Sequence, residues 1–516
     1  MSRVRTLSRT WTREEAAAAK LDRPRDDVLT EQPAPSAGID HRFTLAAGPF
    51  LRYERRLHTG GDGSVREEIE HRLPPLVVPP FTWLYRAALR RRPRHGGRPF
   101  WAPPEPPDAT AANALGGLCL LAVAFGYLGS LLTQTVTFAA DELGADKAAQ
   151  GTTLAGVRIG VLGAVALTAL ADRRGRRRVL LATAVAACVV TAATALVPGM
   201  VALGGAQTVV RALTTAGAVL LAVQVAEEMP AGSRAYGVSL LSMAGALGVG
   251  MALWALPLAD TGEGGWRLLF GLGLLWLPLV AYVGRHLEES RRFQATHADA
   301  PVVGHGRRFW LLAVSALLLN LFTAPASQLM NEFLRDERGF SAARISLFTI
   351  LTNTPGGIGI LVGGRLADVR GRRLVGAVGV LGGTVMTVAM VLAAGWPMWT
   401  FSVVGAVVGA ATVPALGVYG PELFPTSLRG RANGVISVLG VAGGVIGLLA
   451  AGHLAERWDG LGPALALLAI GPLLMAALVL IAYPETAHRE LEELNPEDRA
   501  PDPRPAMPSD QASSVD

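Results

Sequence analysis

The sequence predicts an all-α membrane protein with twelve transmembrane helices in two pseudo-symmetric halves of six. Three observations predict this fold class. The 516-residue chain is 51% hydrophobic and only 17% charged, below the roughly 25% charged residues usual in soluble domains. Apolar runs of about 20 residues, the length that crosses a bilayer core, recur along the middle of the chain. Motifs of the first half also return in the second.

Charge divides the chain into polar tails and an apolar centre. Residues 1–110 carry 19 basic and 14 acidic side chains, and residues 484–516 carry 3 and 9. We expect a cytoplasmic N-terminal tail, a first six-helix half, a cytoplasmic central loop, a second half and an acidic, disordered C-terminal tail. Their predicted bounds are 1–110, 111–284, 285–308, 309–483 and 484–516.

The twelve predicted spans share a length near 20 residues and few charges. They lie near residues 112–138, 149–170, 179–198, 201–225, 236–258, 266–284, 309–330, 343–364, 374–394, 397–419, 433–454 and 463–483.

Basic residues favour one side of the predicted membrane. They gather in alternate short loops, and such loops stay in the cytoplasm, so both termini are expected there. Only Lys20 and Lys147 of the 47 basic residues are lysine, which is typical of a GC-rich bacterial genome and indicates a bacterial inner membrane. Membrane topology accounts for the net charge of +6 without a nucleic-acid partner.

The N-terminal tail contains a predicted hairpin and a predicted interfacial segment. Within residues 42–73, two stretches with strand character flank a Gly-rich turn. Residues 81–98 combine aromatic side chains with six arginines and no acid, a composition that suits anionic lipid. A solvated basic linker is the alternative for this segment.

Three motifs recur at a nearly constant offset. Asp172 in ADRRGRRR (171–178) corresponds to Asp368 in ADVRGRR (367–373), 196 residues later. Glu227 and Arg234 correspond to Glu422 and Arg429 at an offset of 195, and Glu289 corresponds to Glu485 at 196. All lie at predicted cytoplasmic ends of spans. Duplicated halves around a central path are typical of transporters.

At these motifs the chain resembles the major facilitator superfamily, over about residues 111–487. The most specific matches are GRLADVRGRR (364–373) and PELFPTSLRG (421–430). Together with ESRRF (289–293) and PET (484–486), they look most like the sugar porter and metabolite:proton symporter branches. The resemblance implies secondary transport of a small organic solute by alternating access, with a proton as a candidate coupling ion, and it implies no enzyme activity.

The resemblance also implies that the repeated motifs form a cytoplasmic gate. A carboxylate at a helix end can pair with an Arg of the neighbouring turn, and an aspartate can complement a helix N-terminus. The alternative is that these residues only fix topology. The predicted gating residues are Asp172, Arg176, Glu227, Arg234, Asp368, Arg372, Glu422 and Arg429.

Two cations, Arg158 and Arg211, lie deep within predicted spans. A charge at membrane depth costs at least about 2.5 to 3.5 kcal/mol on insertion scales, so each should face a partner or water. The sequence offers no acid at comparable depth, which suggests an electropositive cavity whose anionic substrate supplies the missing charge. The alternative is that both guanidiniums bond to helix carbonyls, to Gln134 or to Gln207.

Other polar residues of the spans are further candidates for substrate binding. The resemblance implies that the first, fourth, seventh and tenth spans line the cavity. Each side chain could equally make an interhelical hydrogen bond. They are Gln134, Gln207, Asn320, Asn353 and Tyr419.

Departures from the family pattern bear on substrate and coupling. Residues 317–328 lack the Gln pair usual in sugar porters, and residues 112–138 lack the acid usual in the first span of proton symporters. No metal-ligand cluster, cofactor motif or catalytic triad is visible. The expectation is a monomeric transporter without cofactor or metal. A drug-type exporter, or a non-transporting sensor that signals through its N-terminal tail, remain alternatives.

Overall fold

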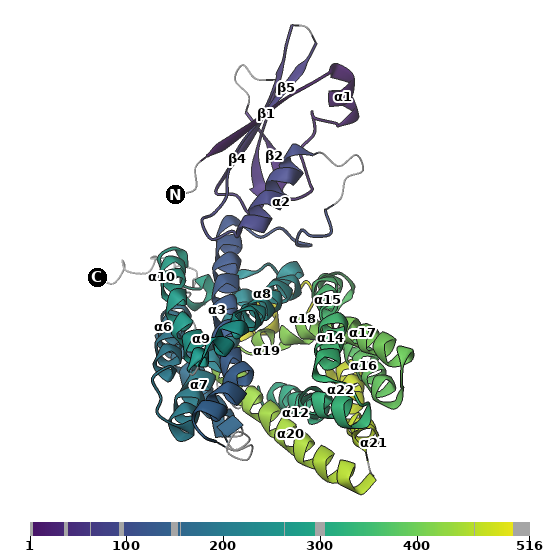
Figure 1. Ribbon diagram of the computed structural model, residues 1–516. Coiled ribbons are helices and arrows are strands. Elements are labelled where there is room, and N and C mark those ends of the chain that lie inside the picture. Colours follow the sequence, from purple (N-terminus) through teal and green to yellow (C-terminus); the bar gives the residue numbers. More distant parts are fainter. Residues whose placement is uncertain are drawn as a thin grey trace, which may run out of the picture.

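The computed structural model describes residues 4–498 except 36–39, 62, 92–97, 146–152, 155, 263, 295–304 and 459. A sheet domain formed by the N-terminal residues stands on one end of a helical bundle, and α3 (Ala109–Glu142) runs from it into the bundle (Figure 1). Eleven helical stretches among the described residues are long and apolar enough to cross a membrane. The remaining predicted span, near 149–170, is represented by the short helix η1 (Arg158–Gly160) and by α5 (Val161–Arg174).

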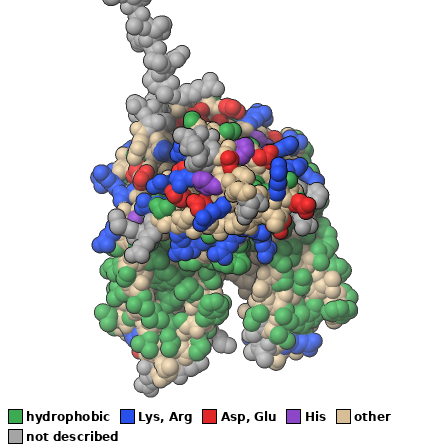
Figure 2. Space-filling view, turned by 90° about the horizontal axis from the view of Figure 1, so that it is seen from above, with side chains coloured by type: hydrophobic (Ala, Val, Ile, Leu, Met, Phe, Trp, Pro, Cys, Tyr) green, Lys and Arg blue, Asp and Glu red, His purple; other side chains and the backbone are tan. Residues whose placement is uncertain are grey.

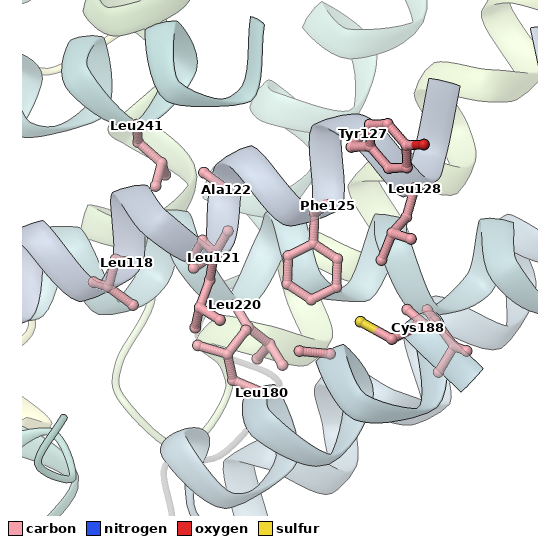
Figure 3. Packing of buried hydrophobic residues seen from close by; sticks show 14 of the residues in the cluster. Leu118, Leu121, Ala122, Phe125, Tyr127, Leu128, Leu180, Cys188, Leu220 and Leu241 are labelled. Carbon is pink, nitrogen blue, oxygen red and sulfur yellow. The ribbon is translucent and has the colours of Figure 1, made fainter. Parts of the chain in front are cut away.

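The first half of the bundle begins with α3 and ends with α10. Besides α3, η1 and α5 it contains α6 (Arg176–Thr194), α7 (Met200–Glu228), α8 (Arg234–Ala255), α9 (Gly265–Gly271) and α10 (Trp276–His286). Its core packs α3 against its neighbours: Leu121, Phe125 and Leu128 point toward Leu180 and Cys188 of α6 (Figure 3). Both cysteines are free.

The second half repeats this arrangement with several helices broken into shorter pieces. It contains α12 (Gly306–Gln328), α14 (Ala342–Asn353), α15 (Gly356–Arg370), α16 (Arg372–Leu392), α17 (Trp396–Ala410), α18 (Thr412–Gly417), α19 (Tyr419–Glu422), α20 (Arg429–Trp458), α21 (Leu461–Leu468) and α22 (Ile470–Ala482). The all-α fold of two six-helix halves is therefore confirmed.

Two close helix pairs join the halves, α5 with α20 and α8 with α15. A methyl group on Gly434 of α20 would lie 2.6 Å from the Thr168 hydroxyl, and one on Gly364 of α15 would collide with the Ser239 hydroxyl. The two contacts occupy equivalent positions of the repeat, because Thr168 corresponds to Gly364 at an offset of 196 and Ser239 corresponds to Gly434 at an offset of 195. In both contacts the first half contributes the hydroxyl residue and the second half contributes the glycine. Glycine at these crossings lets the two halves approach closely.

The N-terminal region forms one five-stranded antiparallel sheet in the order β1-β5-β4-β3-β2. Its strands and flanking helices are β1 (Arg5–Trp11), α1 (Arg13–Ala18), β2 (Thr30–Ala34), β3 (His41–Ala47), β4 (Arg52–Thr59), β5 (Val65–Arg72) and α2 (Pro79–Arg90). The sequence predicts two strands, which correspond to β4 and β5. It does not reveal β1, because six of the seven β1 residues are not buried and the strand lacks a clear apolar face.

Helix α2 covers the sheet, which differs from the expected interfacial segment at 81–98. Tyr85 and Leu89 are buried against Phe50 and Ile69 of the sheet domain, and the Tyr85 and Phe50 rings meet edge to face at 5.8 Å. The apolar side of α2 is thus already occupied by protein, although Trp83 remains 69% exposed. Residues 92–97 of the expected segment lie outside the described part of the chain.

The C-terminal tail also differs from its expectation. Residues 484–498 are ordered: they contain α23 (Leu491–Leu494) and the turn η7 (Pro496–Asp498), and Leu491, Asn495 and Asp498 are buried. The acidic composition of this tail predicts disorder. The sequence does not reveal the positively charged partners that order it, because they lie far away in the chain. Residues 499–516 lie outside the described part.

A buried ion pair organises the sheet domain. Glu31 and Arg55 lie 2.7 Å apart with both side chains fully buried, and Tyr53 donates a 2.6 Å hydrogen bond to Glu31. We expect Glu31→Gln to destabilise the domain by about 3 kcal/mol, because an uncompensated buried charge costs this much or more. Faster hydrogen exchange of the β4 amides in the intact protein would report the loss. Glu68→Gln, which removes the partner of the exposed Arg66, should change exchange little.

The same pair predicts how the stability of the sheet domain depends on pH. Burial by itself raises the pKa of Glu31, but the hydrogen bonds and charge of Arg55 outweigh it and hold the pKa below its ordinary value of 4.5. The stabilisation is therefore fully present above that ordinary value and is lost as pH falls through the lowered pKa of the folded state. Exchange-derived stability of β4 should fall with acidification below about pH 4.5 in the wild type, and less steeply in Glu31→Gln.

Candidate functional site

Two equivalent glycine turns position the arginines of the repeated motifs. Gly175 and Gly371 have φ angles of 103° and 102°, which L side chains rarely adopt. A methyl group on either would also lie 2.7 Å from a carboxylate oxygen, of Glu289 or Glu485 respectively. Those carboxylates accept hydrogen bonds from the backbone just after each turn, at 2.9 and 3.0 Å. Each turn directs the first arginine after the glycine toward the other half.

Glu227 of the first half binds arginines from both halves. It pairs with Arg176 of its own half and with Arg429 of the second half. All three side chains are buried. Arg176 also donates a 2.7 Å hydrogen bond to the Thr426 carbonyl in the second half. Glu227 therefore holds the two halves together at this face.

Glu422 repeats this arrangement from the second half. It pairs with Arg372 of its own half and, at 3.3 Å, with Arg234 of the first half. Arg372 donates a 3.0 Å hydrogen bond to the Ala231 carbonyl. Since Ala231 precedes Thr426 by 195 residues, even this backbone contact obeys the pseudo-symmetry.

The two aspartates bind helix N-termini across the interface. Asp172 accepts hydrogen bonds from the backbone of Gly430 and Arg431 at 3.1 and 2.8 Å, at the start of α20. Asp368 accepts from Ala235 and Tyr236 at 3.2 and 2.8 Å, at the start of α8. A carboxylate there satisfies free N–H groups and complements the positive end of the helix dipole.

We call these eight residues the latch: Asp172, Arg176, Glu227, Arg234, Asp368, Arg372, Glu422 and Arg429. Four arginines face four carboxylates, so the formal charges cancel. Buried ion pairs of this kind are stable only while every partner is in place. The latch therefore closes one face between the halves in this conformation. Charged side chains gather on one part of the molecule, and two largely hydrophobic lobes with a gap between them extend from it (Figure 2).

The C-terminal segment adds carboxylates to the latch that the sequence analysis did not foresee. Asp498 lies 3.3 Å from Arg429 and accepts two hydrogen bonds from the Thr426 backbone and one from its hydroxyl. Glu490 lies 3.3 Å from Arg234 and 3.1 Å from Arg292. These acids have no counterpart at a fixed offset, so the repeat could not reveal them.

The segment linking the sheet domain to α3 crosses the same face. Ser233 of the first half exchanges hydrogen bonds of 2.8 Å with the Glu105 backbone, and Tyr236 donates one of 2.6 Å to the Trp101 carbonyl. Arg365 of the second half donates to the Phe100 carbonyl at 3.0 Å. The linker therefore contacts both halves beside the latch.

The two deep cations lie beside each other at the interface of the halves. Arg158 donates a hydrogen bond to the Gln328 side chain in the second half, a partner that the sequence did not indicate. Gly160 lies against α7, where a methyl group on it would lie 3.0 Å from Cβ of Arg211. Arg211 is exposed and makes no ion pair or side-chain hydrogen bond with any residue that the structure describes.

The other predicted substrate-binding residues divide into two groups. Gln207 is 3% exposed and donates a 3.0 Å hydrogen bond to Thr194 of α6. Tyr419 is fully buried and donates a 3.0 Å hydrogen bond to the Pro484 carbonyl. Both side chains therefore brace neighbouring segments in this conformation, and their role in substrate binding stays a prediction.

The remaining three candidates are not fully buried. Asn320 is partly buried, bonds to the Ala316 carbonyl of its own helix at 2.9 Å and lies against Gly440 of α20. Gln134 is partly buried, and Asn353 is exposed at the end of α14. The structure does not bring these three together with Arg211 by any contact among the described residues.

Comparisons with known proteins identify relatives of both halves. The family model described as "Sugar (and other) transporter" matches residues 109–300, and that described as "Major Facilitator Superfamily" matches 311–509. A "Putative metabolite transport protein" of Haemophilus influenzae is 27% identical over 363 residues, which are 64% of this chain and 86% of the relative.

Solved structures share the fold. The proton:xylose symporter XylE bound to 6-bromo-6-deoxy-D-glucose matches with a TM-score of 0.62 at 18% identity, over 75% of this chain and 98% of that one. The E. coli fucose:proton symporter FucP matches with a TM-score of 0.60 at 13% identity, over 73% and 100%. At such identities the likeness concerns the fold alone.

The latch predicts a coupled loss of stability and closure. Glu227→Gln leaves Arg176 and Arg429 buried without their shared carboxylate, which should lower the unfolding free energy by about 3 kcal/mol and separate the halves at this face. Spin labels at Arg178 and Arg373, which are exposed on opposite halves, should report longer distances. Glu422→Gln should act alike because its contacts are equivalent. The exposed Glu288→Gln is the control; equal distances in all three variants would contradict the latch.

Proposed function

Because this chain belongs to the major facilitator superfamily and is a secondary transporter, we propose that its substrate is a small organic anion that binds between the halves at Arg211. The observation that supports this substrate class is the unpaired cation. Arg211 lies on the fourth predicted span, and its guanidinium has no carboxylate partner among the described residues. A charge at this depth favours a compensating charge, and an anionic substrate would supply it each time it binds.

The position of Arg158 supports an anion site between the halves. Its hydrogen bond to Gln328 crosses from one half to the other, so Arg158 faces the second half, and Arg211 lies next to the helix turn that carries Arg158. A carboxylate offers Arg the planar, paired acceptors that its guanidinium fits best. A neutral sugar would leave both positive charges uncompensated.

The latch supports alternating access with the described conformation closed on the charged face. We place that face and both termini in the cytoplasm of a bacterial inner membrane, in agreement with the basic residues of its loops. Opening this face requires that the cross-half contacts of Glu227 and Glu422 break together. Substrate binding from the opposite side would supply part of the free energy for that change, because a ligand shifts a two-state equilibrium only by its differential affinity.

The test begins with substrate class. Monocarboxylates, dicarboxylates, neutral sugars and cationic drugs are compared by thermal shift of the purified protein, since a ligand of the folded state raises its apparent stability. Carboxylates are expected to stabilise it. Stabilisation by sugars or cations without any effect of carboxylates would overturn the proposal, and with cations it would favour the exporter alternative.

Transport of the stabilising acid into proteoliposomes then tests Arg211. Arg211→Gln should weaken binding about ten- to a hundredfold, the loss of one charge-assisted hydrogen bond of about 1.5 to 3 kcal/mol. Arg178→Gln removes an equal charge from the exposed cytoplasmic end of α6 and should leave the apparent affinity unchanged. Uptake measured with and without an imposed proton gradient reports coupling. Full-rate, full-affinity uptake by Arg211→Gln would contradict the assignment.

A further inference from the structure

A cavity of about 640 Å³ lies between the sheet domain and the end of the sixth span. The sheet contributes Arg5 of β1 and His71 of β5, and α2 contributes Arg86. The opposite wall is formed by Tyr282 and His286 at the end of α10. Its size falls within the range of about 300 to 1,000 Å³ typical of small-molecule sites. Neither Arg211 nor any latch residue lines the cavity, so it is a separate site.

The polar groups of this cavity lack partners. Arg5 and Arg86 form no ion pair with any carboxylate in the described part of the chain, and the Nε of Arg86 is buried without a hydrogen bond. His71 is only 2% exposed, yet neither ring nitrogen makes a hydrogen bond of normal geometry with a described residue. Buried polar groups are almost always satisfied. Arg86 and His71 carry such buried, unpartnered nitrogens, and the exposed Arg5 lines the same cavity. Together these groups indicate a missing acceptor.

The acids nearest in sequence do not supply that acceptor. Side chains alternate along a strand, so Glu68 and Glu70 lie on the face of β5 opposite to His71, and Glu70 pairs there with Arg56 at 3.2 Å. Glu67 shares the face of His71 but accepts a hydrogen bond from Trp11. Burial lowers the pKa of His71 most; the charges of Arg86 and Arg5 lower it further, while a contact with the Ile69 backbone opposes the shift.

We propose that this cavity binds a phosphate-bearing ligand, with Arg5 and Arg86 on the phosphate and His71 donating a further hydrogen bond. Guanidiniums fit phosphate oxygens in paired hydrogen bonds. Leu73, Pro74 and Val77 provide apolar wall for the organic part of the ligand. Two sources share this chemistry: a soluble phosphorylated metabolite and the headgroup of an anionic phospholipid.

Occupancy of the site would tie the sheet domain to the transporter body. Tyr282 of α10 already donates a 3.2 Å hydrogen bond to the Pro75 carbonyl in the loop that lines the cavity. A ligand held by Arg86 on one wall and facing α10 on the other would add a second connection between the same two parts. The ligand therefore stabilises the docked position of the domain.

The experiment compares the full-length protein with matched charge variants by thermal shift. Inorganic phosphate and AMP are the soluble probes in detergent; nanodiscs of phosphatidylglycerol and of phosphatidylcholine are the lipid probes. Arg86→Gln and Arg5→Gln remove the proposed phosphate partners, and neither residue has an ion pair whose loss would unfold the domain. Arg90→Gln is the control, because it removes one positive charge from the same helix but does not line the cavity.

A soluble ligand is supported if phosphate or AMP stabilises the wild type and if Arg86→Gln and Arg5→Gln each raise the ligand concentration needed about tenfold. Arg90→Gln should leave that concentration unchanged. Stabilisation by phosphatidylglycerol over phosphatidylcholine, lost in the same two variants alone, supports a lipid headgroup. The proposal is overturned if no probe stabilises the wild type, if the two cavity variants respond like wild type, or if Arg90→Gln loses as much as they do.

Discussion

The structure depends on two buried glutamates that each bind arginines from both halves of the molecule. Glu227 contacts Arg176 and Arg429, and Glu422 contacts Arg372 and Arg234. A buried carboxylate without its cation is strongly unfavourable, so these contacts form together or break together. That cooperativity fixes how the halves meet at the charged face.

Both ends of the chain are attached to this closed face. The C-terminal segment places Asp498 beside Arg429, and the linker from the sheet domain bonds to Tyr236 and Arg365. Since Tyr236 also binds Asp368 through its backbone, the linker is connected to the latch through Tyr236. The sheet domain is thus positioned to respond to any movement of the two halves, which gives a physical basis for coupling a ligand of that domain to the transport cycle.

The repeat in the sequence made much of this predictable. A constant offset of 195 or 196 identified the eight latch residues as two equivalent sets, and the structure brings both sets together. Residues outside the repeat were less accessible to prediction. Gln207 and Tyr419 are polar residues in apolar helices, and the sequence alone could not distinguish a cavity-facing side chain from one that braces a neighbouring helix. Gln328 could not be predicted as the partner of Arg158, because η1 and α12 meet only in the folded molecule.

The sequence by itself determined the spans, the duplication and the identity of the charged residues at the helix ends, because length, hydrophobicity and offset are local or periodic properties. The tertiary structure decided which arginines of the opposite half each glutamate binds. It also decided that β1, β2 and β3 complete a sheet with β4 and β5, and that acidic residues near the C-terminus are ordered. These outcomes depend on groups far apart in the chain whose charges or apolar faces are satisfied only in the folded molecule. Arg5, His71 and Arg86 meet in one cavity for the same reason.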